Sequence, residues 1–102
     1  MLKETLKRND ILVEQIGYNM TLYSFYKVVE RKGCTVKIIP LAHTNNWHGF
    51  MLNDVKPIDR KFWLEKEVLT RRFNKWGTIR GKYDNNLYLY DENRTYTEDH
   101  AD

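Results

Sequence analysis

The chain has 102 residues, a length that accommodates one domain, and its 41% hydrophobic and 30% charged residues are typical of a globular protein rather than a disordered chain. It carries 17 Lys and Arg against 14 Asp and Glu, and a net charge of +3 is compatible with an anionic partner without requiring one. A single cysteine, Cys34, argues against a disulfide-stabilised secreted scaffold, and neither a signal peptide nor an apolar run of about 18 residues is present, so we expect a cytoplasmic protein with no membrane partner.

Short runs of β-branched and aromatic residues, separated by turn residues, predict strands through the first half of the chain. The predicted strands are residues 10–16, 22–31, 35–39 and 50–55. Gly17-Tyr18-Asn19 and Lys32-Gly33 are typical turn sequences between them. Pro40 has no backbone N–H, so we expect it to end the third strand, and residues 42–49 are predicted to form a loop. Residues 58–65 fit a strand or a short helical turn.

Two consecutive hairpins are predicted within residues 67–91. Their three-residue connections are Lys75-Trp76-Gly77 and Asp84-Asn85-Asn86. The first connection ends in the glycine expected of a type I turn followed by a left-handed residue, and the second is rich in residues that tolerate left-handed geometry. The resulting registers place Asn74 opposite Thr78, Tyr83 opposite Leu87, and Arg80 opposite Tyr90.

These registers sort the side chains of the two hairpins onto two faces. The apolar face contains Leu69, Phe73, Ile79, Tyr83, Leu87 and Leu89. The opposite face contains Arg72, Arg80, Lys82, Tyr88 and Tyr90. A slip of one residue would mix the two sets, so the pattern supports the register. Arg71 falls on the apolar face, which we interpret as a position at the rim of a barrel or at a bulge.

Five to seven short antiparallel strands in about 90 residues must hide one face of their sheet. The predicted fold is therefore mainly β, a small, strongly bent antiparallel sheet or a partly open barrel, with at most short helical turns. Residues 1–97 are predicted to form this single domain. Residues 98–102 contain no large apolar side chain, so we expect a frayed C-terminal tail.

A basic and aromatic face is the strongest candidate for a binding site. Arg72, Arg80 and Lys82 supply positive charge for phosphates, and Tyr88 and Tyr90 supply flat surfaces for stacking of bases. The sequence therefore predicts an anionic nucleotide or nucleic acid as a ligand. Cross-strand pairs of cationic and aromatic side chains also stabilise sheets without any ligand, which is the competing interpretation.

Two further segments carry recognition candidates. Tyr18 and Asn19 lie in a predicted turn, where an exposed aromatic ring and a polar side chain could contact a ligand, unless Asn19 only bonds its own backbone. Trp47 and Trp63 lie in the less patterned middle of the chain. Because interface hot spots are enriched in Trp, these two residues are candidates for contact with a protein partner.

The sequence contains no recognisable set of catalytic or metal-binding residues. His43 and His48 share one predicted loop, but a zinc site needs about four ligands, and the two read as surface histidines. Cys34 has no base beside it in the sequence, and no nucleophile elbow or phosphate loop occurs. We therefore expect no enzymatic activity, no cofactor and no metal ion; the competing hypothesis is a nuclease or nucleotide hydrolase whose catalytic residues come together only in the fold.

Two stretches resemble a family of small phage and prophage proteins with a Gly-Tyr turn followed by a Phe-Tyr strand. The residues that carry the resemblance are 10–13, 17–21, 25–29, 55–57, 70–73 and 88–91. The resemblance implies a phage protein acting in the cytoplasm of a bacterial host. By analogy with such proteins, it implies non-catalytic counter-defence, either blocking a host defence protein or sequestering a nucleotide signal. The alternative is a general nucleic-acid-binding module of a phage or mobile element. A homo-oligomer is compatible with the sequence.

Overall fold

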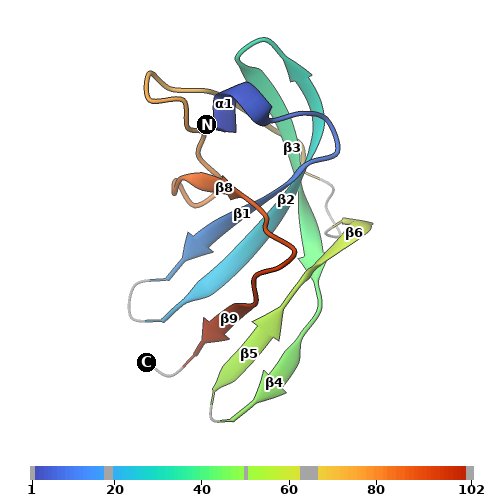
Figure 1. Ribbon diagram of the computed structural model, residues 1–102, viewed down its shortest axis with the longest axis vertical. Coiled ribbons are helices and arrows are strands. Elements are labelled where there is room, and N and C mark those ends of the chain that lie inside the picture. The colour runs from blue at the N-terminus through green and yellow to red at the C-terminus, as the bar shows by residue number, and fades with distance from the viewer. Residues whose placement is uncertain (1, 18–19, 50, 63–66, 101–102) are drawn as a thin grey trace.

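The computed structural model describes residues 2–17, 20–49, 51–62 and 67–100, with the backbone alone described for 59–62. Within these residues the chain forms one short helix and nine strands (Figure 1). In chain order they are α1 (Leu2–Thr5), β1 (Ile11–Ile16), β2 (Leu22–Lys32), β3 (Thr35–His43), β4 (Asn46–His48), β5 (Leu52–Val55), β6 (Pro57–Phe62), β7 (Leu69–Arg72), β8 (Leu87–Leu89) and β9 (Tyr96–Asp99).

The strands form two antiparallel sheets. The larger, six-stranded sheet has the order β6-β3-β2-β1-β8, with β7 also paired to β3, and the smaller has the order β4-β5-β9. The larger sheet curls strongly into a half-barrel, which confirms the predicted mainly β fold with a bent antiparallel sheet. The described strands outnumber the predicted five to seven because several, such as β4 and β8, are only three residues long.

Both faces of the larger sheet are covered, and each has its own hydrophobic core. Tyr26 and Val28 point into the first core, inside the half-barrel, whereas Tyr23 and Phe25 point into the second. The first core contains Leu6, Leu12, Tyr26, Val28, Val36, Ile38, Leu69, Phe73, Ile79 and Leu87. The second contains Val13, Phe25, Leu41, Val55 and Tyr96. Burying one large apolar side chain contributes about 1.5–3 kcal/mol, so these two cores hold the sheets together.

β3 continues through Pro40 to His43, so the expectation that Pro40 ends this strand is wrong. On one side of β3, Pro40 lies opposite Tyr26 of β2. On the other side, β7 pairs with residues 35–38 and the first register position with β6 is Leu41. On this second side Pro40 therefore falls between the two partner strands and is registered with neither, so its missing N–H interrupts no pair there.

The predicted loop at 42–49 is also wrong, because Asn46–His48 form β4 and pair with β5. The side chain of Asn53 explains the difference. Its Oδ1 accepts a hydrogen bond from the backbone N–H of Asn46 at 2.8 Å, and its Nδ2 donates to Asn45 Oδ1 at 2.8 Å. Asn53 is 1% exposed, so a buried side chain on the neighbouring strand organises this segment. The strand predicted at 50–55 is present as Leu52–Val55.

The C-terminal segment is a paired strand rather than the frayed tail predicted for residues 98–102. β9 pairs with β5, and Asp99 also exchanges two backbone hydrogen bonds with Thr21. Glu98 is 5% exposed, and its carboxylate accepts hydrogen bonds from the backbone N–H of Tyr23 and from Asn53 Nδ2. The buried carboxylate of Glu98 thus anchors this segment, although the segment contains no large apolar side chain. Residues 101 and 102 lie outside the described part.

The first predicted hairpin register is confirmed and the second is wrong. The backbone N–H of Asn74 donates to Thr78 O at 2.9 Å, and Gly77 has a φ of 76°, as the turn sequence requires. In the second hairpin Arg80 pairs with Asn86 rather than with Tyr90. The chain reverses earlier, at residues 81–84, where Asp84 adopts a φ of 64°.

Candidate functional site

A buried carboxylate determines where the second hairpin turns. Glu14 of β1 is 0% exposed and accepts hydrogen bonds from the Tyr26 hydroxyl at 2.6 Å and from the backbone N–H of Asn85 at 2.9 Å. The Tyr26 hydroxyl in turn accepts a hydrogen bond from the backbone N–H of Lys82 at 3.1 Å. Because buried polar groups need partners, residues 82–85 are held on β1 and β2. This contact places Arg80 and Lys82 beside β7.

The result is a groove of about 400 Å³ lined by Arg71 and Arg72 of β7 together with Arg80, Lys82 and Asp84 of the β7–β8 connection. We call it the basic groove. Arg71 is the residue that the sequence places on the apolar face. Its guanidinium reaches the rim, where Nε donates to Arg80 O at 3.0 Å. Four cationic side chains thus converge on a surface that also carries Asp84, and the Glu67 carboxylate lies beside Lys82.

The cations of the basic groove differ in how they are held. Arg80 donates from Nη1 to Asp84 O at 2.9 Å, and Lys82 Nζ lies 3.0 Å from the carboxylate of Glu67. The side chain of Arg72 is exposed and makes no hydrogen bond or ion pair with the described residues. Exposed ion pairs contribute only about 0–1 kcal/mol, so exchanging Glu67 for a ligand phosphate costs little.

The structure separates the two tyrosines of the predicted face from its cations. Tyr88 is 61% exposed on β8 but does not line the basic groove. Tyr90 packs edge-on against Phe25, with ring centroids 5.8 Å apart, in the second core. Partial burial and the nearby Tyr96 raise the pKa of Tyr90. The corrected register also exposes Tyr83 (55%) and Leu89 (49%), which the sequence assigned to the apolar face.

The other predicted recognition residues are only partly described. Tyr18, Asn19 and Trp63 lie outside the described residues. Trp47 is 57% exposed on β4, and its ring lies 4.8 Å from the ring of His100. It is accessible to a partner and lies at the end of the molecule that carries the smaller sheet (Figure 1).

The histidines take part in local hydrogen bonds. His48 Nε2 lies 2.9 Å from Asp54 Oδ1, and this oxygen also accepts a hydrogen bond from the Thr97 hydroxyl. The Thr97 bond, followed by the His48 bond, lowers the pKa of Asp54. In the described ranges, no group of three or more His, Cys, Asp or Glu side chains is arranged to hold a metal ion. Cys34 is half-buried against the first core.

Sequence reasoning missed Glu14 and Gly81, which organise the basic groove. Glu14 interrupts the apolar β1 sequence, and a carboxylate in that position is a signal for a buried hydrogen-bonded site. A Cβ atom at Gly81 would lie 2.2 Å from Glu14 Oε1. Only the tertiary structure shows that these two residues approach each other closely, because they are far apart in the sequence.

Comparison of the chain with protein-family models, curated proteins and solved structures finds no match. Among the described residues, none of the helical segments has the length and apolar character needed to span a bilayer.

The Glu14–Tyr26 pair predicts a loss of stability in alkali. Burial, followed by the hydrogen bond to Glu14, raises the pKa of Tyr26 above its ordinary value of 10.0. As the pH rises, the Tyr26 hydroxyl therefore loses its proton in the unfolded chain before it does so in the folded protein. The contribution of the protonated Tyr26 to the free energy of unfolding is complete below pH 10 and decreases as the pH rises further. One proton accounts for a slope of up to about 1.4 kcal/mol per pH unit in the free energy of unfolding.

Urea unfolding between pH 8 and 11 measures this slope. Tyr26→Phe should be less stable than the parent at pH 8 and should show a flatter decline above pH 10. Tyr88→Phe, which changes an exposed tyrosine that does not contribute to the raised pKa of Tyr26, serves as the control and should retain the parental slope. An identical slope for Tyr26→Phe and the parent would contradict this assignment.

Proposed function

We propose that this protein is a non-catalytic binding protein for phosphate-bearing anions of the nucleotide class, with the basic groove as the binding site. The observation that supports the proposal is the convergence of Arg71, Arg72, Arg80 and Lys82 on one concave surface. Guanidinium groups form paired hydrogen bonds with phosphate oxygens, so they recognise this chemistry better than scattered charges do. A volume of about 400 Å³ lies within the range of small-molecule sites.

The cellular role that we propose is phage counter-defence through sequestration of a nucleotide signal. The support is the resemblance of the sequence to small phage proteins, together with a groove of the size of one nucleotide rather than of a long strand. Blocking a host defence protein directly is the other form of this role, and exposed Trp47 is the residue that supports it.

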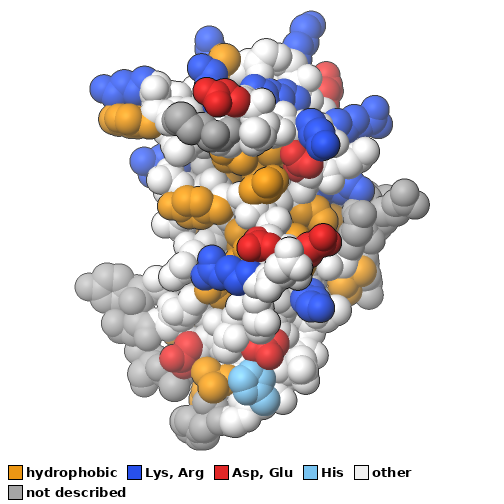
Figure 2. All heavy atoms as spheres, viewed as in Figure 1, with side chains coloured by type: hydrophobic (Ala, Val, Ile, Leu, Met, Phe, Trp, Pro, Cys, Tyr) orange, Lys and Arg blue, Asp and Glu red, His pale blue; other side chains and the backbone are white. Residues whose placement is uncertain are grey.

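General nucleic-acid binding is a second candidate, and the distribution of charge supports it. Lys and Arg side chains gather over the end of the molecule that carries α1 and the β2–β3 hairpin (Figure 2). A polyanion would contact many of these side chains at once, whereas a nucleotide would contact the basic groove alone. Because each phosphate contact of a polyanion releases counterions, the affinity for nucleic acid would fall steeply with salt.

Charge reversal in the basic groove tests the proposal. Arg72→Glu and Arg80→Glu together should weaken binding of inorganic pyrophosphate and of a nucleoside triphosphate about a hundredfold, since each charge-assisted hydrogen bond contributes about 1.5–3 kcal/mol. Isothermal titration calorimetry measures the affinity, and circular dichroism verifies the fold. Arg80→Glu could disturb the turn, so Arg72→Glu is also tested alone, because the Arg72 side chain bonds to none of the described residues.

Lys32→Glu is the matched control, since Lys32 is an exposed cation at the end of β2 and lies outside the basic groove. It should leave the affinity for pyrophosphate unchanged. An equal loss in Lys32→Glu, together with a strong salt dependence, would favour the nucleic-acid candidate. Unchanged affinity in the folded Arg72→Glu and Arg80→Glu variants would overturn the basic groove as the site.

A further inference from the structure

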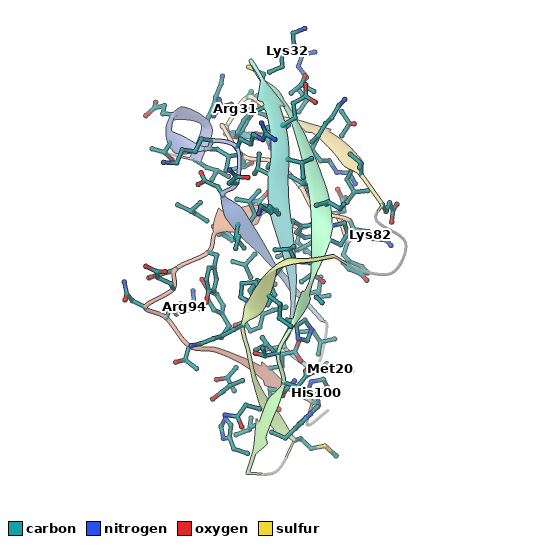
Figure 3. The ribbon with its side chains drawn as sticks, turned by 90° about the vertical axis from the view of Figure 1, so that its right-hand side faces the viewer. Met20, Arg31, Lys32, Lys82, Arg94 and His100 are labelled. Carbon is teal, nitrogen blue, oxygen red and sulfur yellow. The ribbon has the colours of Figure 1, made fainter. Side chains whose placement is uncertain are left out.

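A second concave site lies between β1, β8 and the β8–β9 connection, away from the basic groove. It has a volume of about 190 Å³, and we call it the tyrosine pocket. Its polar and aromatic lining consists of Gln15, Tyr23, Tyr88, Asp91, Arg94 and Tyr96. Arg94 and Lys82 lie on opposite sides of the molecule in Figure 3, so the two sites are separate.

The base of the tyrosine pocket is formed by a buried ring with several fixed partners. Tyr96 is 2% exposed, and its hydroxyl accepts a hydrogen bond from the backbone N–H of Asp91 at 3.1 Å. The ring of Tyr23 meets the ring of Tyr96 edge-on, with centroids 5.2 Å apart. The guanidinium of Arg94 lies over the Tyr96 ring, 4.8 Å from its centroid. A buried aromatic residue therefore orients both a second ring and a cation, and a ligand meets a preformed surface.

The open side of the tyrosine pocket provides further groups for contact with a ligand. Tyr88 is 61% exposed and projects from β8, a strand that is held in place by its pairing with β1. Gln15 is exposed, and its amide forms no hydrogen bond with the described residues. An amide supplies both donors and an acceptor, so it can bond the polar edge of a ring.

This combination selects for a planar ring with a polar edge. Aromatic side chains and a guanidinium stack on flat π surfaces, and this stacking does not require a charged ligand. The volume of about 190 Å³ accommodates a single ring system and lies below the range of drug-sized sites. Asp91 beside Arg94 opposes the binding of a phosphate here, unlike in the basic groove.

We propose that the tyrosine pocket binds a nucleobase by stacking, with Gln15 contacting the edge of the base. Tyr88 and Arg94 form the sides of the pocket, and Tyr23 and Tyr96 form its base. This inference goes beyond the proposed function, because it assigns recognition of the base to a surface that the basic groove does not include. It requires binding of a nucleoside that carries no phosphate.

Titration with nucleosides observed by ¹H–¹⁵N NMR tests this site directly. The probes are adenosine, guanosine, cytidine and uridine. At least one should bind saturably and shift the signals of the Gln15 side-chain amide and of residues 88–96. The absence of saturable shifts with all four, or shifts confined to other surfaces, would overturn the proposal.

Substitutions distinguish stacking from a purely structural role of the tyrosines. Tyr88→Leu should weaken the best nucleoside about tenfold or more, because one base–aromatic stack contributes on the order of 1–3 kcal/mol. Tyr88→Phe keeps the ring and should retain binding. Tyr83→Leu alters a comparably exposed tyrosine outside the pocket and should have no effect. Equal affinity in Tyr88→Leu and in the parent protein would overturn the assignment.

The same samples separate this inference from the proposed function. Inorganic pyrophosphate reports on the basic groove alone, and a nucleoside reports on the tyrosine pocket alone. Binding of pyrophosphate without binding of any nucleoside would overturn only the tyrosine pocket. If the two sites are independent, the Arg72→Glu and Arg80→Glu protein should bind a nucleoside with unchanged affinity.

Discussion

Gly81→Ala should lower the free energy of unfolding by about 4 kcal/mol, since overpacking and the loss of buried hydrogen bonds each contribute about 1–3 kcal/mol. The added methyl group would lie 2.2 Å from Glu14 Oε1 and 2.9 Å from Leu87 Cδ2. Glu14 cannot move away without breaking its bonds to Tyr26 and Asn85. Urea unfolding followed by tryptophan fluorescence measures the change.

Gly33→Ala provides the comparison for Gly81→Ala. Gly33 has a φ of 61° but no atom within 4 Å of an added Cβ, so its substitution should cost only the left-handed strain, about 1–2 kcal/mol. A double-mutant cycle isolates the contact itself. In a Glu14→Ala background, the added effect of Gly81→Ala should fall by more than half, because the carboxylate is gone. Equal effects in the two backgrounds would show that Glu14 is not the cause.

Glu98→Ala should lower the free energy of unfolding by about 3 kcal/mol, because it leaves buried donors without acceptors. The Glu98 carboxylate accepts hydrogen bonds from the backbone N–H of Tyr23 at 3.0 Å and from Asn53 Nδ2 at 3.2 Å. These bonds connect β9 to β2 and β5, so the substitution should loosen the smaller sheet from the half-barrel. Thermal unfolding and hydrogen exchange at Tyr23 and Thr21 measure both effects.

Glu92→Ala is the matched control for Glu98→Ala, since Glu92 is an exposed glutamate in the β8–β9 connection. Its substitution should change stability by no more than about 0.5 kcal/mol. A Glu98→Ala protein as stable as Glu92→Ala would indicate that the C-terminal strand contributes nothing, as a frayed tail would. Loss of protection at Thr21 in Glu98→Ala alone would instead agree with the pairing of Thr21 with Asp99.

These two carboxylates also connect stability with the proposed sites. Glu14 holds the turn that brings Arg80 and Lys82 to Arg71 and Arg72, and Glu98 bonds the backbone of Tyr23 in the tyrosine pocket. Each proposed site therefore depends on a buried carboxylate that no ligand would touch. Variants at these positions should be compared for stability before their binding is interpreted.

The sequence alone determined the mainly β class and much of the strand placement. The alternation of apolar and polar residues is a local property, and it correctly located β1, β2 and β5 and the burial of Phe73 and Ile79. The Lys75-Trp76-Gly77 turn was also predictable, because a left-handed glycine after a type I turn depends only on neighbouring residues.

The tertiary structure alone decided how the candidate sites are assembled. The second hairpin turns where Asn85 meets Glu14, a residue 71 positions earlier. β9 pairs with β5, and its Glu98 bonds the backbone of Tyr23, 75 positions earlier. The partners of a buried carboxylate are the donors that the fold brings near it, and no local sequence pattern indicates which donors these are. The cations of the predicted face therefore converge on one groove, whereas Tyr88 lines a different pocket and Tyr90 packs into the second core.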